Sequence, residues 1–148
     1  PVFRPYIQGE EDQIKNLVLE VLGEHGFTYD PVLNHDLDYP AETYRIGRGQ
    51  MFVVVYHGQI IGTHGLVDQG EIAYCRRLTI AKNFRGNGWL YPQANHVIKY
   101  CKQQGFRIIR LDTLEKFGMV PSFKKTGYEI VNRIQEEENT KVIMELKL

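Results

Sequence analysis

The sequence predicts one domain of the α/β (α+β) class, residues 1–148, with a mixed, mostly antiparallel sheet of about seven strands flanked by about four helices. Three observations support this prediction. A chain of 148 residues is long enough for one core. Its 43% of hydrophobic and 24% of charged residues are near the average of globular domains. Its hydrophobic period also changes several times between that of a helix and that of a strand.

The first third of the chain is expected to form a short strand, a helix and loops. The strand is "VFRPYI", and the apolar residues after it have helical spacing, with acidic residues in the first turn where the helix dipole favours them. These apolar residues are Ile14, Leu17, Val18, Val21 and Leu22. From residue 27 to residue 50 the period is lost, so we expect loops with one short helix around residues 40–47. The run "NHDLD" is interpreted as a polar loop rather than a site.

The rest of the chain is expected to alternate strands with two helices. Two strands joined by a tight His57-Gly58 turn are indicated by "MFVVVY-HG-QIIGTHGL", and a third by "EIAYCRRLTIA". A helix ending at a Gly105 cap comes next, then the strand "FRIIRLDT", a short helix in "VPSFKKTG", and the strands "YEIVNR" and "TKVIMELKL". We expect the long helix to begin around Gly88, where its apolar face starts. Pro92 would then leave one carbonyl group unpaired.

Composition and charge exclude several classes of partner. Lys plus Arg equal Asp plus Glu at 18 each, so the formal net charge is zero, which argues against a nucleic-acid partner. No apolar run approaches the roughly 18 residues of a membrane span, so no membrane partner is expected. With only two cysteines and no secretory pattern in the first residues, we expect a cytoplasmic location and no disulfide framework. The histidines show no metal-ligand spacing, so no metal is expected.

Residues 81–92, "AKNFRGNGWLYP", carry the most specific signal in the chain. A strand ends near Ala81, an arginine and two glycines follow, and a helix begins. Glycine lets the backbone approach a ligand closely, and the first amides of a helix lack internal partners, so the stretch suits a phosphate anion. Taken alone, it is equally compatible with a connection that binds nothing. The patterns GxxxxGK[ST] and GxGxxG are both absent, which excludes the two commonest phosphate loops.

In its wider context the stretch resembles the GCN5-related N-acetyltransferase (GNAT) superfamily, over almost the whole chain. Three motifs occur in the family's order: "RRLTIAKNFRGNGWL" before a helix, then "GFRIIRLDT", then "SFKKTGYEI". Arg85, Gly86, Asn87 and Gly88 match the start of the family pattern [Q/R]-x-x-G-x-[G/A]. Leu90 departs from it, because the last position is normally Gly or Ala.

The resemblance implies acetyl-CoA as the acyl donor and no metal. It implies that the strand residues Leu78, Thr79 and Ile80 offer their backbone to the pantetheine arm, in a gap between two splayed strands. The pyrophosphate would be held by the residues of the glycine stretch: Arg85, Gly86, Asn87, Gly88, Trp89 and Leu90. A neutral amine would attack the thioester directly, with backbone amides polarising its carbonyl group.

The resemblance also marks one missing group. Many relatives place a tyrosine in the late helix to protonate the departing thiolate, and Phe123 takes this cofactor-binding position here. Water or another group could supply the proton, or the protein could bind the cofactor without efficient turnover. The coenzyme A thiolate is a fairly stable leaving group, so losing the acid need not abolish activity.

Tyr74 is the candidate catalytic residue for deprotonating the amine. Some relatives use a glutamate on the strand before the glycine stretch, and counting back from the motif puts that position at Ile72. Glu71 would therefore point to the opposite face unless a bulge intervenes, whereas Tyr74 shares the face of Ile72. His64 and Glu115 are weaker alternatives, and each of these side chains could be purely structural.

By the resemblance, residues 27–50 lie over the acceptor side of the molecule. Their charges are mixed: Asp30, Asp36, Asp38, Glu42, Arg45 and Arg48. Acidic groups would attract a cationic amine, while Arg76 and Arg77 could hold a carboxylate. This mixture is compatible with an amino acid or another small zwitterion, and equally with an ordinary solvated surface.

The sequence therefore predicts an acetyl-CoA-dependent N-acetyltransferase that acetylates the primary amine of a small molecule. The alternative is a catalytically weak acyl-CoA-binding module or sensor, motivated by Phe123 and Leu90. A protein-modifying acetyltransferase would require an open groove for an extended peptide. The family often forms dimers, sometimes through its final strands, so a homodimer remains an open option.

Overall fold

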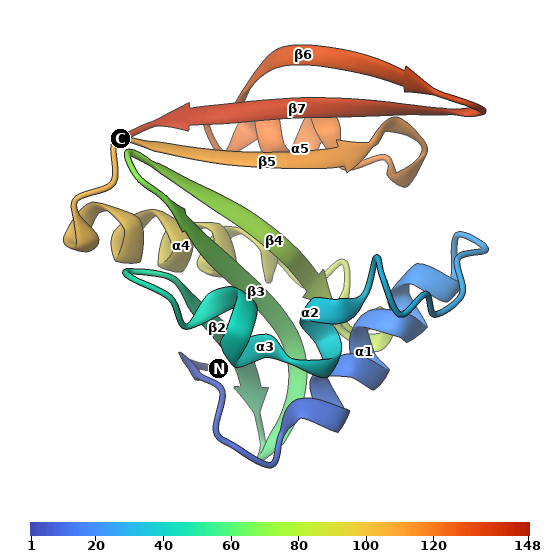
Figure 1. The fold of residues 1–148 in the computed structure, drawn as a ribbon, viewed down its shortest axis with the longest axis vertical. Helices are drawn as coiled ribbons and strands as arrows, with labels where there is room; N and C mark the ends of the chain where they lie inside the picture. The colour runs from blue at the N-terminus through green and yellow to red at the C-terminus, as the bar shows by residue number, and fades with distance from the viewer.

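Figure 1 shows the computed structural model, which describes residues 1–148 as one seven-stranded sheet with helices on both faces. This confirms the predicted fold class. The strands are β1 Val2–Pro5, β2 Gln50–Tyr56, β3 Gln59–Gln69, β4 Ile72–Ile80, β5 Ile108–Leu114, β6 Glu129–Glu136 and β7 Asn139–Lys147. The α-helices are α1 Glu11–Gly23, α2 His35–Asp38, α3 Pro40–Tyr44, α4 Leu90–Gln104 and α5 Val120–Lys125, with 3-10 helices η1 Lys82–Phe84 and η2 Glu115–Phe117. No helix is long and apolar enough to cross a membrane.

The sheet divides into two limbs where β4 meets β5. Its order is β1-β2-β3-β4-β5-β7-β6, and every neighbouring pair is antiparallel except β4 and β5. These two parallel strands pair only from Ile72 with Ile108 to Tyr74 with Arg110. Beyond Tyr74 no residue of β4 pairs with β5, and the strands diverge (Figure 1). One edge of β4 is therefore left without a partner strand.

A β-bulge interrupts β4 beside this gap. Thr63 pairs with Thr79 and Gly65 with Arg76, so Arg77 and the residue after it face a single residue of β3. Arg77 has a φ of 55°, in the left-handed region that residues other than glycine seldom adopt. The hydroxyl of Thr63 stabilises the bulge by donating a 2.7 Å hydrogen bond to the carbonyl oxygen of Arg77. The bulge breaks the alternation of the strand, so the neighbouring Arg76 and Arg77 side chains turn toward the same side.

Two hydrophobic clusters cover opposite faces of the sheet. The larger lies under α4 and α5 and runs across both limbs, including Cys75 of β4, Val97 and Cys101 of α4, and Met144 of β7. The smaller lies under α1–α3, against β2, and belongs to the N-terminal limb alone. Both cysteines are free and buried, and burial raises the pKa of the Cys101 thiol to about 12. They act as packing residues.

The start of α4 corrects one prediction. The helix begins at Leu90, not around Gly88, and its first turn is closed by the Gln93 amide donating to the Trp89 carbonyl at 3.2 Å. Gly86 and Gly88 have φ values of 78° and 77°, which a right-handed helix cannot contain, so residues 85–89 form a loop. Pro92 falls in the first helical turn, where a backbone N–H has no partner within the helix. It therefore removes no helical hydrogen bond.

The segment before β2 also differs from the expectation. The run "NHDLD" does not form a loop: residues 35–38 are helix α2, and the expected helix at 40–47 ends as α3 at Tyr44. Both helices are short, and tertiary contacts hold them. Tyr44 packs so closely on Gly65 of β3 that a Cβ added there would lie 2.4 Å from its ring. The predicted His57-Gly58 turn is confirmed, with φ values of 50° and 76° that are typical of a tight hairpin.

Candidate functional site

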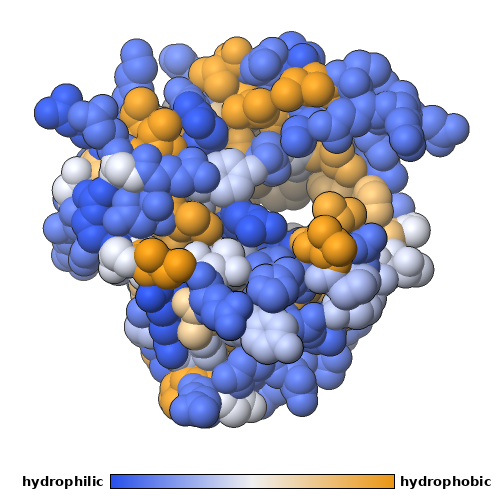
Figure 2. Space-filling view, in the orientation of Figure 1, coloured by the Kyte–Doolittle hydropathy of each residue, from blue (hydrophilic) through white to orange (hydrophobic).

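The largest cavity of the molecule opens where β4 and β5 diverge. Its volume is about 1160 Å³, and its walls come from α1, the α1–α2 connection, β4, the loop before α4, β5 and α5. Figure 2 shows the surface hollowed between the limb that carries β5–β7 and the helices α1–α3. Most of the predicted site residues line this cavity, including Tyr74, Thr79, Gly86 and Phe123.

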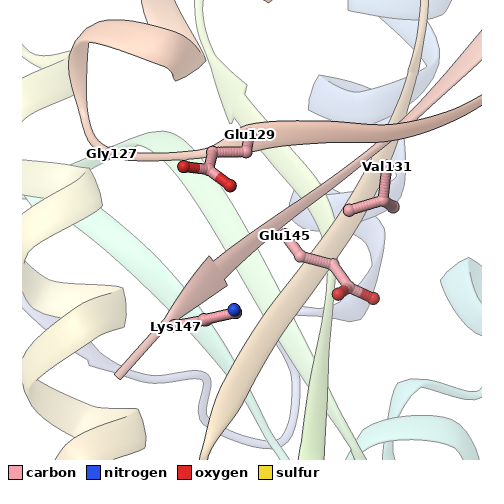
Figure 3. Close-up of a pocket in the computed structure, with 5 residues that line it drawn as sticks. All are labelled: Gly127, Glu129, Val131, Glu145 and Lys147. Atoms are coloured by element: carbon pink, nitrogen blue, oxygen red, sulfur yellow. The ribbon is translucent and has the colours of Figure 1, made fainter.

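A second, smaller pocket of about 200 Å³ lies on β6 and β7 (Figure 3). Glu129 and Glu145 line it but point in different directions. Glu145 is moreover held by Arg110, whose Nε donates to Oε2 at 2.7 Å. The side chains of the smaller pocket do not point toward a common centre, so we take the larger cavity as the candidate site.

The segment from Gly86 to Tyr91, which is the end of the glycine loop and the first two residues of α4, presents free backbone amides at one end of the cavity. None of its consecutive N–H groups donates a hydrogen bond within the protein, to the backbone or to a side chain. A Cβ added at Gly86 or Gly88 would meet no atom within 4 Å, so the backbone faces open space. The indole Nε1 of Trp89 is buried without a partner. Buried or converging N–H groups without partners are the donors that an anion requires.

The Arg85 side chain holds this loop in place. Its guanidinium donates to both carboxylate oxygens of Glu24, at 2.6 and 2.7 Å, and its Nε donates to the Ile80 carbonyl at 3.0 Å. Glu24 follows the last residue of α1, so the pair ties α1 to the loop. The charge of Arg85 is thus largely neutralised, and the free donors of the loop are its amides.

Residues 24–27, which we name the strap, line the cavity and contact groups that follow β4 and β5. On the β4 rim Glu24 binds Arg85. On the β5 rim the rings of His25 and Phe27 contact Phe117, with centroids 4.3 and 6.2 Å apart. Lys116 Nζ lies 4.6 Å from the centroid of the Phe27 ring. The strap thus covers the gap between the two limbs.

Of the predicted strand residues, Leu78, Thr79 and Ile80 lie on the part of β4 that has no β5 partner, and all three line the cavity. Gln93 of α4 fixes this strand from behind, since its Nε2 donates to the Thr79 carbonyl at 3.1 Å and to the Thr63 carbonyl at 2.9 Å. Leu90 packs against the larger core cluster and so turns partly into the protein.

Polar and charged side chains of β4 and β5, which we name the charged floor, line the part of the cavity away from the glycine loop: Tyr74, Arg76, Arg77 and Asp112. The hydroxyl of Tyr74 donates to Oδ2 of Asp112, across the gap from β4 to β5. Burial, together with this bond to Asp112, raises the pKa of Tyr74. The hydroxyl therefore stays protonated at neutral pH, and Asp112 is its acceptor.

Asp36 lies behind this floor, paired with Arg77, and does not itself line the cavity. It is only 3% exposed and accepts from Arg77 Nε at 2.9 Å, from the second Arg77 nitrogen at 2.8 Å and from the Tyr44 hydroxyl at 2.6 Å. Burial alone would raise its pKa, but the hydrogen bonds and charge of Arg77, with help from Tyr44 and Arg76, hold the pKa of Asp36 below its usual value. Asp36 is therefore an ionised carboxylate.

The other candidates lie elsewhere. Glu71 is in the exposed turn before β4, 3.7 Å from Arg107. Glu115 is on η2, 3.8 Å from Arg133. Neither lines the cavity. His64 is fully buried with its Nε2 2.9 Å from Nδ1 of His96, and burial, with the neighbouring His96, lowers the pKa of His64 to about 3.

Phe123 lines the cavity and is 6% exposed, with its ring packed edge-on against Tyr128 at 5.9 Å. Sequence reasoning missed Asp112, Glu24 and Gln93, because each acquires its place only through tertiary contacts. No group of three or more His, Cys, Asp and Glu side chains lies close enough together to hold a metal ion.

The fold and the cavity define an α/β protein with a loop of unpaired backbone amides beside two splayed strands. The chain belongs to the acetyltransferase (GNAT) family, whose model matches residues 18–128. A search among curated proteins gives no match.

Three solved structures illustrate the similarity. An acetyltransferase of the GNAT family from Staphylococcus aureus Mu50 gives a TM-score of 0.86 with 20% identity over 99% of this chain and 98% of that one. An aminoglycoside 6'-N-acetyltransferase complexed with coenzyme A gives 0.77 with 15% identity, over 99% and 97%. A GNAT family acetyltransferase from Elizabethkingia anophelis with acetyl-CoA bound gives 0.72 with 16% identity, over 99% and 97%. At these identities the similarity shows the fold alone.

Proposed function

We propose that the protein is an acetyl-CoA-dependent N-acetyltransferase that acetylates the primary amine of a small molecule. The observation that carries the proposal is the run of free backbone amides from Gly86 to Tyr91 at one end of the gap between β4 and β5. Membership of the acetyltransferase family supports acetyl transfer. The two similar structures that contain coenzyme A or acetyl-CoA support this donor.

The residues present fit such a donor. The amides of residues 86–91 would bind the pyrophosphate, because they are unpaired and lie where glycine leaves the backbone bare. The free edge of β4 at Leu78, Thr79 and Ile80 would hydrogen-bond the pantetheine arm as a strand would. When bound, acetyl-CoA supplies the reactive thioester, and amides on this edge would polarise its carbonyl group.

Tyr74 and Asp112 are proposed to remove the proton from the attacking amine. The Tyr74 oxygen can accept a hydrogen bond from the amine while its own proton is directed to Asp112. As the amine attacks, its proton passes to Tyr74 and the Tyr74 proton passes to the Asp112 carboxylate. The high pKa of Tyr74 keeps the hydroxyl protonated, which this relay requires.

The acceptor is proposed to be small. The contacts of the strap with Arg85 and Phe117 bridge the two sides of the cavity and would restrict an extended peptide. Cytoplasmic location stays a proposal that the free, buried cysteines support.

The alternative function, an acyl-CoA-binding sensor, is favoured by Phe123, which offers no proton to the departing thiolate. Leu90 packs partly against the core while it also lines the cavity, and Pro92 removes no hydrogen bond from the helix, so both functions leave the loop available to coenzyme A. The two functions share coenzyme A binding and differ in turnover.

The test is release of free thiol from acetyl-CoA, measured with a panel of amino acids, polyamines and lysine peptides. We expect release with at least one small amine. Tyr74→Phe should lower kcat about 100-fold, the usual scale of general acid–base catalysis, with unchanged affinity for coenzyme A. Tyr100→Phe is the matched control, because its hydroxyl donates to the Arg48 carbonyl outside the cavity. Tight cofactor binding without release across the panel would establish the sensor instead.

A further inference from the structure

One cation on the cavity wall, unlike the other three, has no acidic oxygen closer than 3.7 Å. Four Lys or Arg side chains line the cavity: Arg76, Arg77, Arg85 and Lys141. Arg77 lies 2.8 Å from Asp36, Arg85 2.6 Å from Glu24, and Lys141 3.3 Å from Glu136. Arg76 has only a 3.7 Å approach to Asp36, beyond hydrogen-bond distance, and its side chain is 32% exposed. Its N–H donors are therefore available to a ligand.

The charges around Arg76 leave a net positive group. Asp36 already accepts two hydrogen bonds from Arg77 and one from Tyr44, so Arg77 compensates its charge. Arg76 is thus a second cation, after Arg77, beside the one carboxylate of Asp36. It lies there because the bulge turns the two consecutive arginine side chains to the same side. A half-buried guanidinium with free donors is suited to bind a carboxylate through two parallel hydrogen bonds.

The floor also has a negative end. Tyr74 and Arg76 are two residues apart on the same face of β4, about 7 Å along the strand. Arg76 is close enough for its charge to oppose the rise in the pKa of Tyr74. The Tyr74 hydroxyl points to Asp112 on β5. A cation and a carboxylate thus flank one tyrosine, and Asp30 on the α1–α2 connection adds a second acid to the cavity wall.

We propose that Arg76 binds a carboxylate of the acceptor, and that the acceptor is an amine bearing a carboxylate, of the amino-acid class. The inference rests on the proposed acetyl transfer and names the substrate of that same site. The ammonium end would lie toward Tyr74 and Asp112, where it loses its proton, and the carboxylate end toward Arg76. Arg77 is excluded from this role, because its donors are used by Asp36 and by the Leu33 carbonyl, the latter at 3.3 Å.

The experiment compares matched trios of acceptors by thiol release: an amino acid, its amide and the amine without the carboxyl group, for example alanine, alaninamide and ethylamine. The wild type should prefer the amino acid of the best trio by at least about 30-fold in kcat/KM, the scale of a hydrogen-bonded charge pair. Arg76→Gln should remove most of that preference through a higher KM. Its kcat/KM for the amide should change less than about threefold.

Two further variants separate binding from structure. Arg76→Lys should recover part of the preference for the amino acid, because lysine restores the positive charge but not the two parallel N–H donors of the guanidinium. Arg107→Gln removes an arginine with an equally long 3.7 Å contact to an acid, outside the cavity, and should change nothing. Calorimetry should show the same coenzyme A affinity in all variants. If Arg76 only neutralised Asp36, Arg76→Gln would destabilise the fold without changing the ratio between acceptors.

The outcomes separate the two proposals. A wild type that releases thiol best with amines lacking a carboxylate overturns the role of Arg76 and leaves acetyl transfer standing. A loss of activity in Arg76→Gln that is equal for all three acceptors also overturns it. No thiol release with any amine overturns acetyl transfer, and this inference with it.

Discussion

The two halves of the cavity are built from different parts of the chain and from different chemical groups. The proposed cofactor half is one contiguous segment, residues 86–91, and it offers backbone amides. The proposed acceptor half takes Tyr74 and Arg76 from β4 and Asp112 from β5, with Asp36 of α2 behind them, and it offers polar and charged side chains. Even the one arginine of the cofactor loop is neutralised, by Glu24.

This difference decides what each half requires of the sequence. A backbone site needs a bare chain with a particular conformation, so it favours glycine at fixed positions within a few residues. A side-chain site needs residues of suitable charge on elements that meet only in the folded protein. The first can be altered by one local substitution, and the second depends on a network. The predictions below test this contrast, from the largest effect to the smallest.

The largest effect is expected from Gly86→Asp. A carboxylate beside the proposed pyrophosphate site should weaken coenzyme A binding at least about 1000-fold, about 4 kcal/mol, because like charges would lie within a few ångströms in a partly desolvated site. Isothermal titration calorimetry measures the affinity. The fold should persist, since a Cβ at Gly86 meets no atom within 4 Å.

Two controls isolate the charge in this experiment. Gly86→Ala shares the strain of a φ of 78°, which costs about 1 kcal/mol, but adds no carboxylate. Gly58→Asp places the same residue at a φ of 76° in the β2–β3 turn, away from the cavity. Undiminished affinity in folded Gly86→Asp would refute the assignment of the loop.

On the acceptor half, Asp36→Ala should destabilise the fold by about 3 kcal/mol, because it leaves Arg77 buried without its partner. Urea unfolding measures the loss. Glu42→Ala, which removes an exposed acid 3.3 Å from His35 on the neighbouring helix, is the control and should cost less than about 0.5 kcal/mol. Equal losses in the two variants would contradict the structural role of Asp36.

The same carboxylate should make stability depend on pH. The pKa of Asp36 is below its usual value in the folded protein, so its contribution is complete above about pH 4 and is lost as the pH falls through the folded pKa. Asp36→Ala should flatten this part of the profile. A variant with an undiminished acid-dependent loss would show that other carboxylates carry it.

The smallest effect on turnover is expected at Phe123 of α5, which lines the cavity. Phe123→Tyr should raise kcat about threefold to tenfold, if protonation of the thiolate limits turnover, with unchanged affinity for coenzyme A. Phe106→Tyr is the control, because Phe106 is buried in the same core cluster but does not line the cavity. No gain in Phe123→Tyr would mean that another step limits turnover.

The sequence was most informative where local patterns are strong. The strands and α4 have clear periodicity, and the His57-Gly58 turn requires two left-handed residues, so the sheet could be predicted. Helix α3 was predicted around residues 40–47 and ends earlier, at Tyr44, whereas α2 was missed, because it has only four residues and depends on tertiary contacts. The start of α4 was placed too early, because the hydrophobic pattern does not reveal the left-handed φ values of Gly86 and Gly88.

The candidate site divides in the same way. The glycine loop is marked by contiguous residues, and it became a candidate site only together with two further motifs of the family. On the acceptor side the sequence named Tyr74, Arg76 and Arg77 but could not show that Arg76 and Arg77 face the same side, because this depends on the bulge at Arg77. The preference for Tyr74 over Glu71 rested on strand alternation, and the structure does place Tyr74 on the cavity and Glu71 outside it. Whether Tyr74 acts on the amine stays a prediction.

The strap has a consequence for the timing of ligand exchange. If a donor with a long arm enters the gap past the strap, the contacts of Glu24 or of the His25 and Phe27 rings must be released and can form again afterwards. Such contacts are broken while the donor passes and are restored afterwards. They therefore lower the association rate and the dissociation rate by the same factor, and the equilibrium affinity is unchanged. The contacts of residues 24–27 would then set how long coenzyme A stays bound after it has given up its acetyl group.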